Sequence, residues 1–167
     1  MSMSVLNVPE ELKDPFFFTS DVVELDLAVH TLFSFEIRHY NGIELDVRPW
    51  NQPEDAIPSI LSCWKEEEEK LKSLFKSRSK HTGESMKREI AAFLMFLFWS
   101  NRQPVQLKDW ERKIDSLPIK PVNAAERLSF IRSNASIYHA YVQLSQLFTE
   151  HHKLFAKQVA LKKYRKK

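Results

Sequence analysis

Ten consecutive residues, 90–99, constrain the fold more than any other part of this chain, because none of them carries a polar side chain. They lie between a charged cluster at 87–89 and a polar exit at 100–102. A helix of this length would be apolar on every side, so other helices or lipid must surround it. It is too short for lipid, because a membrane span needs about 20 apolar residues. The stretch therefore predicts a central buried helix over residues 84–101.

The rest of the chain predicts amphipathic helices that pack around this central helix. Apolar side chains recur there three and four residues apart, which is the helical period. Asn123 followed by Glu126 is typical of a capping box at a helix start. We therefore predict an all-α fold, a single compact bundle of about five to six helices. Besides the central helix, the expected helices begin at Pro53 or Glu54 and end at 77, and span residues 107–117, 123–134 and 135–163.

Residues 21–40 fit two different patterns. Val23, Leu25 and their alternate neighbours indicate a strand, whereas Asp21 with Glu24 resembles a helix start. No breaker occurs before Asn41, so the length favours a helix over 21–40. We predict that helix, followed by an extended connector at 43–47. A short strand somewhere within 21–47 remains the alternative.

The first twenty residues predict an irregular arm that lies against the core. Pro9 favours one helical turn after it, and the apolar run at 16–18 should anchor the arm. We expect one helical domain over residues 1–167, with this arm at 1–20 and a basic tail at 162–167.

Composition points to a cytoplasmic protein. Only two glycines occur, which argues against a sheet-rich fold with many tight turns. The single cysteine, Cys63, excludes an internal disulfide, fits a reducing compartment and is expected to be buried as a small hydrophobe. The opening residues are polar and acidic, unlike a secretory leader, so we expect no membrane segment.

The charge is distributed unevenly along the chain. Residues 1–60 carry eleven acids and three bases, a net charge of −8, whereas residues 61–167 carry eleven acids and twenty-two bases, a net charge of +11. The two halves would complement each other within one fold, or the basic end would meet a polyanion. No acid follows Glu150. The candidate polyanion-binding residues are Lys153, Lys157, Lys162, Lys163, Arg165, Lys166 and Lys167.

Patterns typical of catalysis or metal binding are weak. Glu36 and His39 have the Glu-x-x-His spacing of di-metal bundles, but such sites need a second pair, which the sequence lacks. Two glycines are too few for a phosphate-cradling loop. We therefore predict no catalytic residue, no metal and no cofactor. An enzyme would require a pocket lined by Glu36, His39 or His139 that spacing does not reveal.

Several polar and aromatic residues are expected at helix junctions beside the central helix. One interpretation makes Asn101 and Asn123 caps, Glu126 a capping partner, and Arg127 a ligand for free carbonyls or a buried acid. The other makes the same cluster a groove for a partner. The candidate groove residues are Trp99, Asn101, Arg102, Trp110, Asn123 and Arg127.

Short segments in most parts of the chain carry a family resemblance. They are 14–18 (DPFFF), 98–101 (FWSN) with Pro104 and Val105, 120–123 (KPVN) with 126–128 (ERL), and Tyr138–His139 with Gln143–Leu144. In these segments the sequence resembles the YpoC-like family of small proteins from Bacillus-type bacteria. The resemblance implies a helical domain and no catalytic residue.

These observations lead to two hypotheses for function. The first is a non-enzymatic cytoplasmic accessory protein that interacts with another protein. The alternative is an association with nucleic acid through phosphate contacts of the basic C-terminal helix and tail. The twelve Phe, four Trp and four Tyr would suit either a homodimer face or the core alone.

Overall fold

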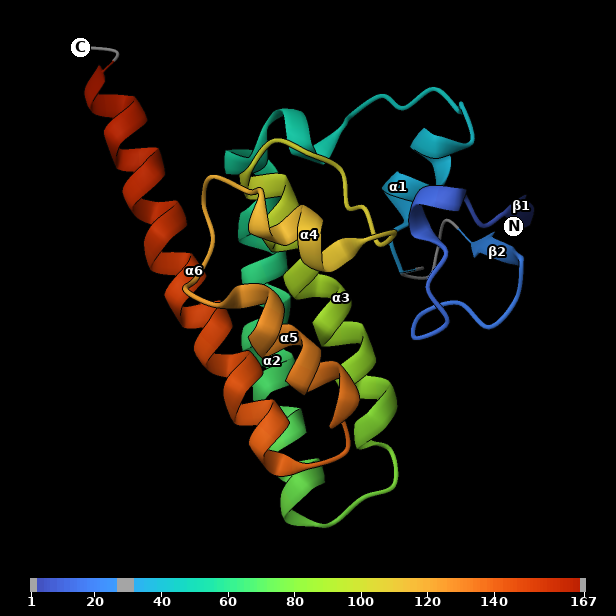
Figure 1. The fold of residues 1–167 in the computed structure, drawn as a ribbon, viewed down its shortest axis with the longest axis vertical. Helices are drawn as coiled ribbons and strands as arrows, with labels where there is room; N and C mark the ends of the chain where they lie inside the picture. The colour runs from blue at the N-terminus through green and yellow to red at the C-terminus, as the bar shows by residue number, and fades with distance from the viewer. Residues whose placement is uncertain (1–2, 27–31, 166–167) are drawn as a thin grey trace.

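A computed structural model describes residues 3–26 and 32–165 of the protein (Figure 1). The described residues form a predominantly helical fold with one small antiparallel sheet, so the predicted fold class is confirmed. Within the described residues no helix is long and apolar enough to cross a membrane. The helices are α1 (Ser34–Tyr40), α2 (Pro53–Lys76), α3 (Thr82–Ser100), α4 (Trp110–Asp115), α5 (Ala124–Ser133) and α6 (Tyr138–Arg165).

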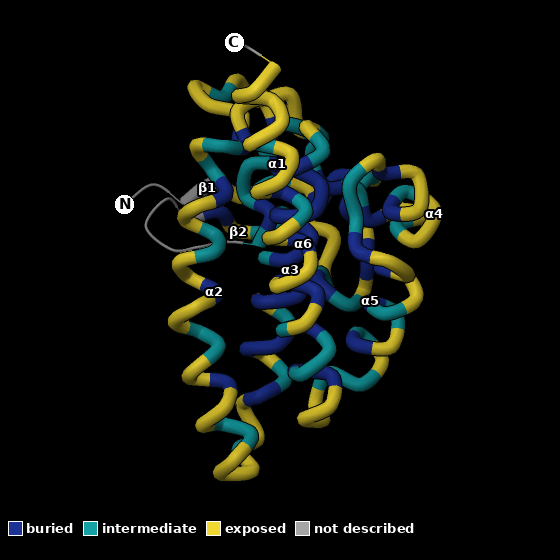
Figure 2. The backbone as a smooth tube through the Cα atoms, turned by 90° about the vertical axis from the view of Figure 1, so that its left-hand side faces the viewer, coloured by how far each residue is buried: buried dark blue, intermediate teal, exposed yellow. Residues whose placement is uncertain are grey.

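Helix α3 is the buried centre of the fold, as its apolar run predicts. Every side chain from residue 90 to 100 is buried except Ala92 and Met95, which are half-buried. Figure 2 shows this helix as a mainly dark blue segment inside the molecule. Helices α2 and α6 both pack against α3 and against each other, and α5 packs against α6. The rings of Trp64 on α2 and Phe148 on α6 stack at a centroid distance of 4.2 Å.

The first part of the chain corrects two predictions. Strand β1 (Met3–Asn7) pairs with strand β2 (Val22–Asp26) in antiparallel register, with Met3 opposite Asp26. The irregular arm is therefore wrong at β1, and the helix over 21–40 is wrong at β2. Leu25 is buried while Val22 and Glu24 are exposed, which is the alternation of a half-buried strand. The helical prediction is correct for α1, residues 27–31 lie outside the described residues, and 43–47 is a connector as expected.

The N-terminal arm is anchored as predicted. A 3-10 turn, η1 (Glu10–Leu12), follows Pro9, and the side chains of Leu12 and Phe17 are buried. The backbone carbonyl of Glu11 accepts hydrogen bonds from the N–H groups of Leu107 and Lys108. The arm therefore lies against the loop that follows α3.

Three further details differ from the predictions. Asn123 adopts a left-handed conformation (φ 57°) and its side chain makes no capping hydrogen bond, so the capping box is wrong although α5 does begin there. Asp109 is also left-handed (φ 54°), which delays the start of α4 to Trp110. Cys63 is exposed on α2, so its predicted burial is wrong.

Candidate functional site

The six candidate groove residues divide between the surface and the interior. Trp99 is buried at the C-terminal end of α3. Arg102 lines one surface hollow, whereas Asn123 and Arg127 line another. The structure therefore separates residues that a ligand can reach from residues that hold the fold together.

Trp99 belongs to a buried contact centred on Glu36. The Glu36 Oε2 atom accepts hydrogen bonds from the indole N–H of Trp99 at 2.6 Å and from the backbone N–H of Val105 at 3.0 Å. The Tyr40 hydroxyl donates to the carbonyl of Val105 at 3.1 Å. Glu36 is fully buried. These bonds fasten α1 to the end of α3 and to the loop after it.

Burial determines the protonation of Glu36. Desolvation raises the pKa of its carboxyl group to about 7, and the hydrogen bonds from Val105 and Trp99 only partly oppose this effect. A second buried carboxyl group, that of Glu89 on α3, behaves in the same way, because burial and the nearby charge of Glu67 raise its pKa to about 7. Both groups exchange protons near neutral pH.

We expect Glu36 to make stability fall as the pH rises from about 5 to about 8. In the folded chain Glu36 keeps its proton up to pH about 7, whereas an ordinary glutamate loses it near 4.5. The folded state therefore loses stability relative to the unfolded chain as the pH rises between these two values. A Glu36→Gln variant keeps an oxygen for Trp99 and Val105 but cannot ionise. The unfolding free energy of the native protein minus that of the variant should decrease by about 3 kcal/mol over this range, measured by urea denaturation.

The matched control for this pH dependence is Glu24→Gln. Glu24 is an exposed carboxyl group on β2, so this substitution should leave the slope of stability against pH unchanged. If the Glu36→Gln protein followed the pH dependence of the native protein, the protonation of Glu36 in the folded state would be disproved.

Asn101 and Arg102 continue the chain from α3 in two different roles. The Asn101 amide donates to the carbonyls of Leu97 and Ile119 and accepts the N–H of Ile119, each at 2.8 Å. The predicted cap is therefore present, and it also fixes the segment before α5. Arg102 instead reaches the start of α2, where it donates to the carbonyl of Asn51 at 2.7 Å.

Trp110 packs against a buried ion pair. Arg132 on α5 approaches Asp14 of the arm at 2.7 Å, and the two side chains are only 14% and 7% exposed. The guanidinium of Arg132 lies over the rings of Trp110 and Phe16, 4.7 and 4.9 Å from their centroids. This cluster joins the arm to α4 and α5.

Asn123 and Arg127 border an open hollow of about 290 Å³ between α5 and α6. The Arg127 guanidinium pairs with Glu150 at 2.6 Å and donates to the carbonyl of Val122 at 3.1 Å. The carbonyl contact agrees with the first interpretation of Arg127, although Glu150 is an exposed acid. The hollow is lined by Asn123, Glu126, Arg127, Phe130, His139 and Gln143.

His151 and Ser100 form a buried pair that resembles a nucleophile with its base but is arranged differently. The imidazole Nε2 lies 3.1 Å from the Ser100 hydroxyl, which itself donates to the carbonyl of Phe96 at 2.5 Å. Burial lowers the pKa of His151 to about 3, so the ring is neutral. The hydroxyl proton is directed at a carbonyl and not at the imidazole, so the ring is not placed to accept it as a base would. The contact instead joins α3 to α6.

The cations near the end of α6 are mostly unpaired. Among the described residues only Lys162 forms an ion pair there, with Glu54 of α2 at 3.4 Å. Within the described part of the chain, Lys153, Lys157, Lys163 and Arg165 are exposed and make no ion pair. The last turns of α6 diverge from the neighbouring helices in Figure 1. Lys166 and Lys167 lie outside the described residues.

Comparison with known proteins identifies the family. Residues 54–163 match the sequence profile of YpoC-like proteins. The chain belongs to the YpoC-like family. A relative from Bacillus subtilis (strain 168), named Uncharacterized protein YpoC, is 33% identical over 115 residues, which cover 68% of this chain and 70% of that protein. No solved structure matches the chain.

The match to the YpoC-like family covers α2 to α6 and leaves out β1, β2 and α1. The matched region therefore contains the central helix and the helices that cover it. Glu36 lies outside this region but is bonded to Trp99 within it. Five of the six residues around the hollow between α5 and α6 lie in the short segments that carry the resemblance; the exception is Phe130.

The interior polar contacts were missed by sequence reasoning. Glu36 and Trp99 are 63 positions apart, Ser100 and His151 are 51 apart, and Asp14 and Arg132 are 118 apart. No local spacing connects such partners. The one available signal was a charged or polar residue inside an apolar stripe, which marks His151 on α6.

Proposed function

We propose that this YpoC-like protein acts by binding another macromolecule and not by catalysis, and that the end of α6 binds the phosphate backbone of nucleic acid. The observation that carries the proposal is the unpaired positive charge of α6. Lys153, Lys157, Lys163 and Arg165 are exposed, and the described residues offer them no acidic partner. Cations in this state release counterions from nucleic acid when they meet its phosphates, and this release drives association.

The placement of these cations favours a backbone contact over sequence reading. They follow one another along the second half of α6, and from residue 156 to 165 every residue is exposed except Val159, which is half-buried. Lysine side chains bind phosphate as point charges and carry no base-specific geometry. We therefore expect affinity that depends strongly on salt and weakly on sequence.

Two copies of the protein would repel each other at this surface. Seven cations and no acid follow Glu150 in each chain, so pairing of α6 with α6 would bring like charges together. The exposed side chains of Leu161 and Tyr164 lie among these cations, and Tyr164 is 81% exposed. An aromatic ring beside lysines suits a nucleic acid, because every base has a face on which the ring can stack.

Three of the buried titratable groups support binding as the mode of action. Glu36 bonds Trp99, Asp14 pairs with Arg132, and His151 contacts Ser100, so each is engaged in joining one element of the fold to another. None of these three groups is exposed to a substrate in solution, since each is less than 9% exposed.

The test is a salt titration followed by fluorescence anisotropy with duplex and single-stranded DNA and RNA. We expect binding to each at low salt. The logarithm of the association constant should fall linearly with the logarithm of the salt concentration. A Lys153→Gln/Lys157→Gln variant should reduce the slope of that line by about two, since each phosphate contact contributes about one.

The matched control removes the same charge elsewhere. Lys65→Gln/Lys76→Gln changes two exposed lysines of α2, so it should leave the slope nearly as it is in the native protein. No binding at low salt to any of the four nucleic acids would reject the proposal. An equal loss in both double variants would show a general effect of net charge and would also reject α6 as the binding surface.

A further inference from the structure

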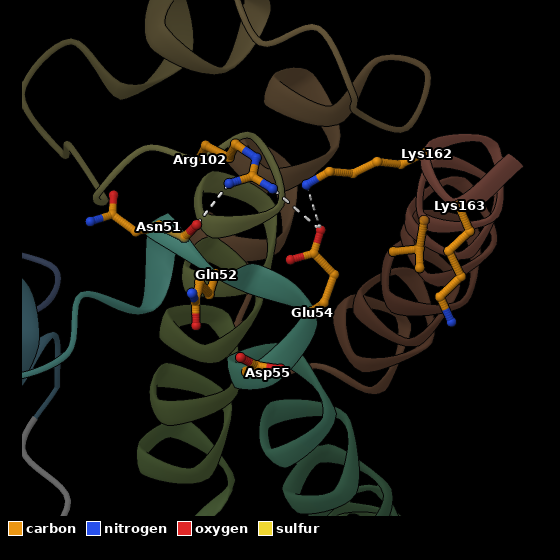
Figure 3. Close-up of a pocket in the computed structure, with 8 residues that line it drawn as sticks. Asn51, Gln52, Glu54, Asp55, Arg102, Lys162 and Lys163 are labelled. Atoms are coloured by element: carbon orange, nitrogen blue, oxygen red, sulfur yellow. Dashed lines mark hydrogen bonds and ion pairs between the residues drawn. The ribbon is translucent and has the colours of Figure 1, made fainter. Parts of the chain in front are cut away.

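A second feature of α6 lies on its inner side, where a hollow opens between the start of α2, the end of α3 and the last turns of α6. Its volume is about 370 Å³. Figure 3 shows Arg102 and Lys162 reaching from opposite sides toward Glu54. We call it the Glu54 hollow; its lining residues are Asn51, Gln52, Glu54, Asp55, Arg102, Val159, Lys162 and Lys163.

Two cations share a single carboxylate oxygen in this hollow. The Arg102 guanidinium and the Lys162 ammonium each lie 3.4 Å from Oε1 of Glu54. Lys163 lines the same hollow and makes no ion pair within the described residues. Three cations therefore surround the position of one paired anion.

The Glu54 carboxyl group is ionised in this position. Its partial burial would raise its pKa, but the hydrogen bond from its own backbone N–H and the charges of Lys162 and Arg102 outweigh that effect and leave the pKa below the ordinary value. At neutral pH the side chain is thus an anion held between two cations.

We propose that the Glu54 hollow binds a phosphate group of the nucleic acid, and that the Glu54 carboxylate occupies the place of this phosphate in the free protein. The inference rests on the proposed function and locates one contact of it. Carboxylate and phosphate oxygens accept the same hydrogen bonds from arginine and lysine, so Arg102 and Lys162 can exchange one for the other. The present pairs are half-exposed and long, and exposed ion pairs are weak, so Glu54 is readily displaced.

The hollow also connects to the unpaired cations of α6. Lys163 belongs to both, because it lines the hollow and follows Lys157 along the same helix. A nucleic acid strand that contacts the outer lysines could therefore place a neighbouring phosphate between Arg102 and Lys162. In this arrangement Glu54 acts as an internal competitor that lowers the affinity.

The decisive comparison is between two carboxyl groups of the same hollow. Glu54→Gln frees Arg102 and Lys162 and should strengthen binding of single-stranded DNA about fivefold, the effect of one surface ion pair. Asp55→Asn removes the same charge from the same hollow, but Asp55 forms no ion pair within the described residues, so we expect at most about a twofold change from long-range charge. Equal strengthening by the two substitutions would overturn the proposal.

The role of Arg102 is tested by combining substitutions. Arg102→Gln should weaken binding, and it should abolish most of the gain from Glu54→Gln, because the freed cation is then missing. Unfolding midpoints are measured in parallel, and Lys163→Gln serves as a second variant that breaks no described contact. If the Glu54→Gln gain persisted in full with Arg102→Gln, phosphate binding in the hollow would be excluded.

A direct readout separates this inference from the proposed function. Titration of the full-length protein with inorganic phosphate should shift the Arg102 side-chain N–H signal in the NMR spectrum, and more strongly in Glu54→Gln. Failure of nucleic-acid binding with an intact phosphate shift would reject the proposed function, and with it nucleic acid as the source of the phosphate, but would leave the hollow as a phosphate site. Nucleic-acid binding without any shift at Arg102 would reject the hollow alone.

Discussion

A Leu94→Lys variant should fail to form the folded protein. Leu94 is 1% exposed in the middle of α3, which other helices surround. Loss of a buried leucine side chain alone costs about 2–5 kcal/mol. The ammonium group adds a desolvation cost of several kcal/mol, since no acid lies in this apolar run to pair with it. The sum approaches the whole stability of an ordinary domain, about 5–15 kcal/mol.

Met95→Lys is the matched control on the next position of the same helix. Met95 is half-buried, so a lysine there can keep its methylene chain on the core and its charge in water. We expect this variant to remain soluble and to unfold cooperatively in urea, followed by circular dichroism. A soluble, cooperatively unfolding Leu94→Lys protein would refute the interpretation of α3 as the buried centre.

The success of the sequence at α3 and its failure at the sheet have the same physical origin. A run of ten apolar residues predicts a buried helix without knowledge of any distant partner, because its environment must be apolar on all sides. The pattern at Val22–Asp26 is stable as a strand only because Met3–Asn7 pairs with it, and that partner is distant in sequence. Local periodicity allows both structures at such a place, and a long-range contact selects one.

The junction residues show the same division. Asn101 was predicted as a cap from its place after α3, and its amide does bond the carbonyl of Leu97. Asn123 has an equally favourable sequence context, yet its backbone is left-handed and its side chain makes no capping hydrogen bond. Backbone conformation at a single residue is set by the loop that leads into the helix, which the capping pattern does not describe.

The uneven charge of the chain has two consequences at once. Acids of the first sixty residues do pair with later cations, as Glu10 does with Lys108 and Glu54 with Arg102. This agrees with complementary halves within one fold. The end of α6 is the exception, since among its described cations only Lys162 finds such a partner. The remaining charge supports the proposed nucleic-acid contact.

The second large effect is expected at the ion pair of Asp14 and Arg132. Arg132→Met should lower the unfolding free energy by about 3–5 kcal/mol, because it leaves the Asp14 charge buried without its partner. It also removes the cation from the rings of Trp110 and Phe16. The arm would then lose its contact with α5, and urea denaturation should show a lower midpoint.

A double-mutant cycle isolates the pair itself. Asp14→Leu combined with Arg132→Met removes both charges, and it should restore part of the stability lost in either single variant, since no unpaired charge stays buried. Arg112→Met is the matched control: its pair with Asp109 is exposed, so the loss should stay below about 1 kcal/mol. Additive losses in the cycle would mean that the Asp14–Arg132 pair contributes no coupling energy of its own and that Arg132 stabilises the arm through its aromatic contacts.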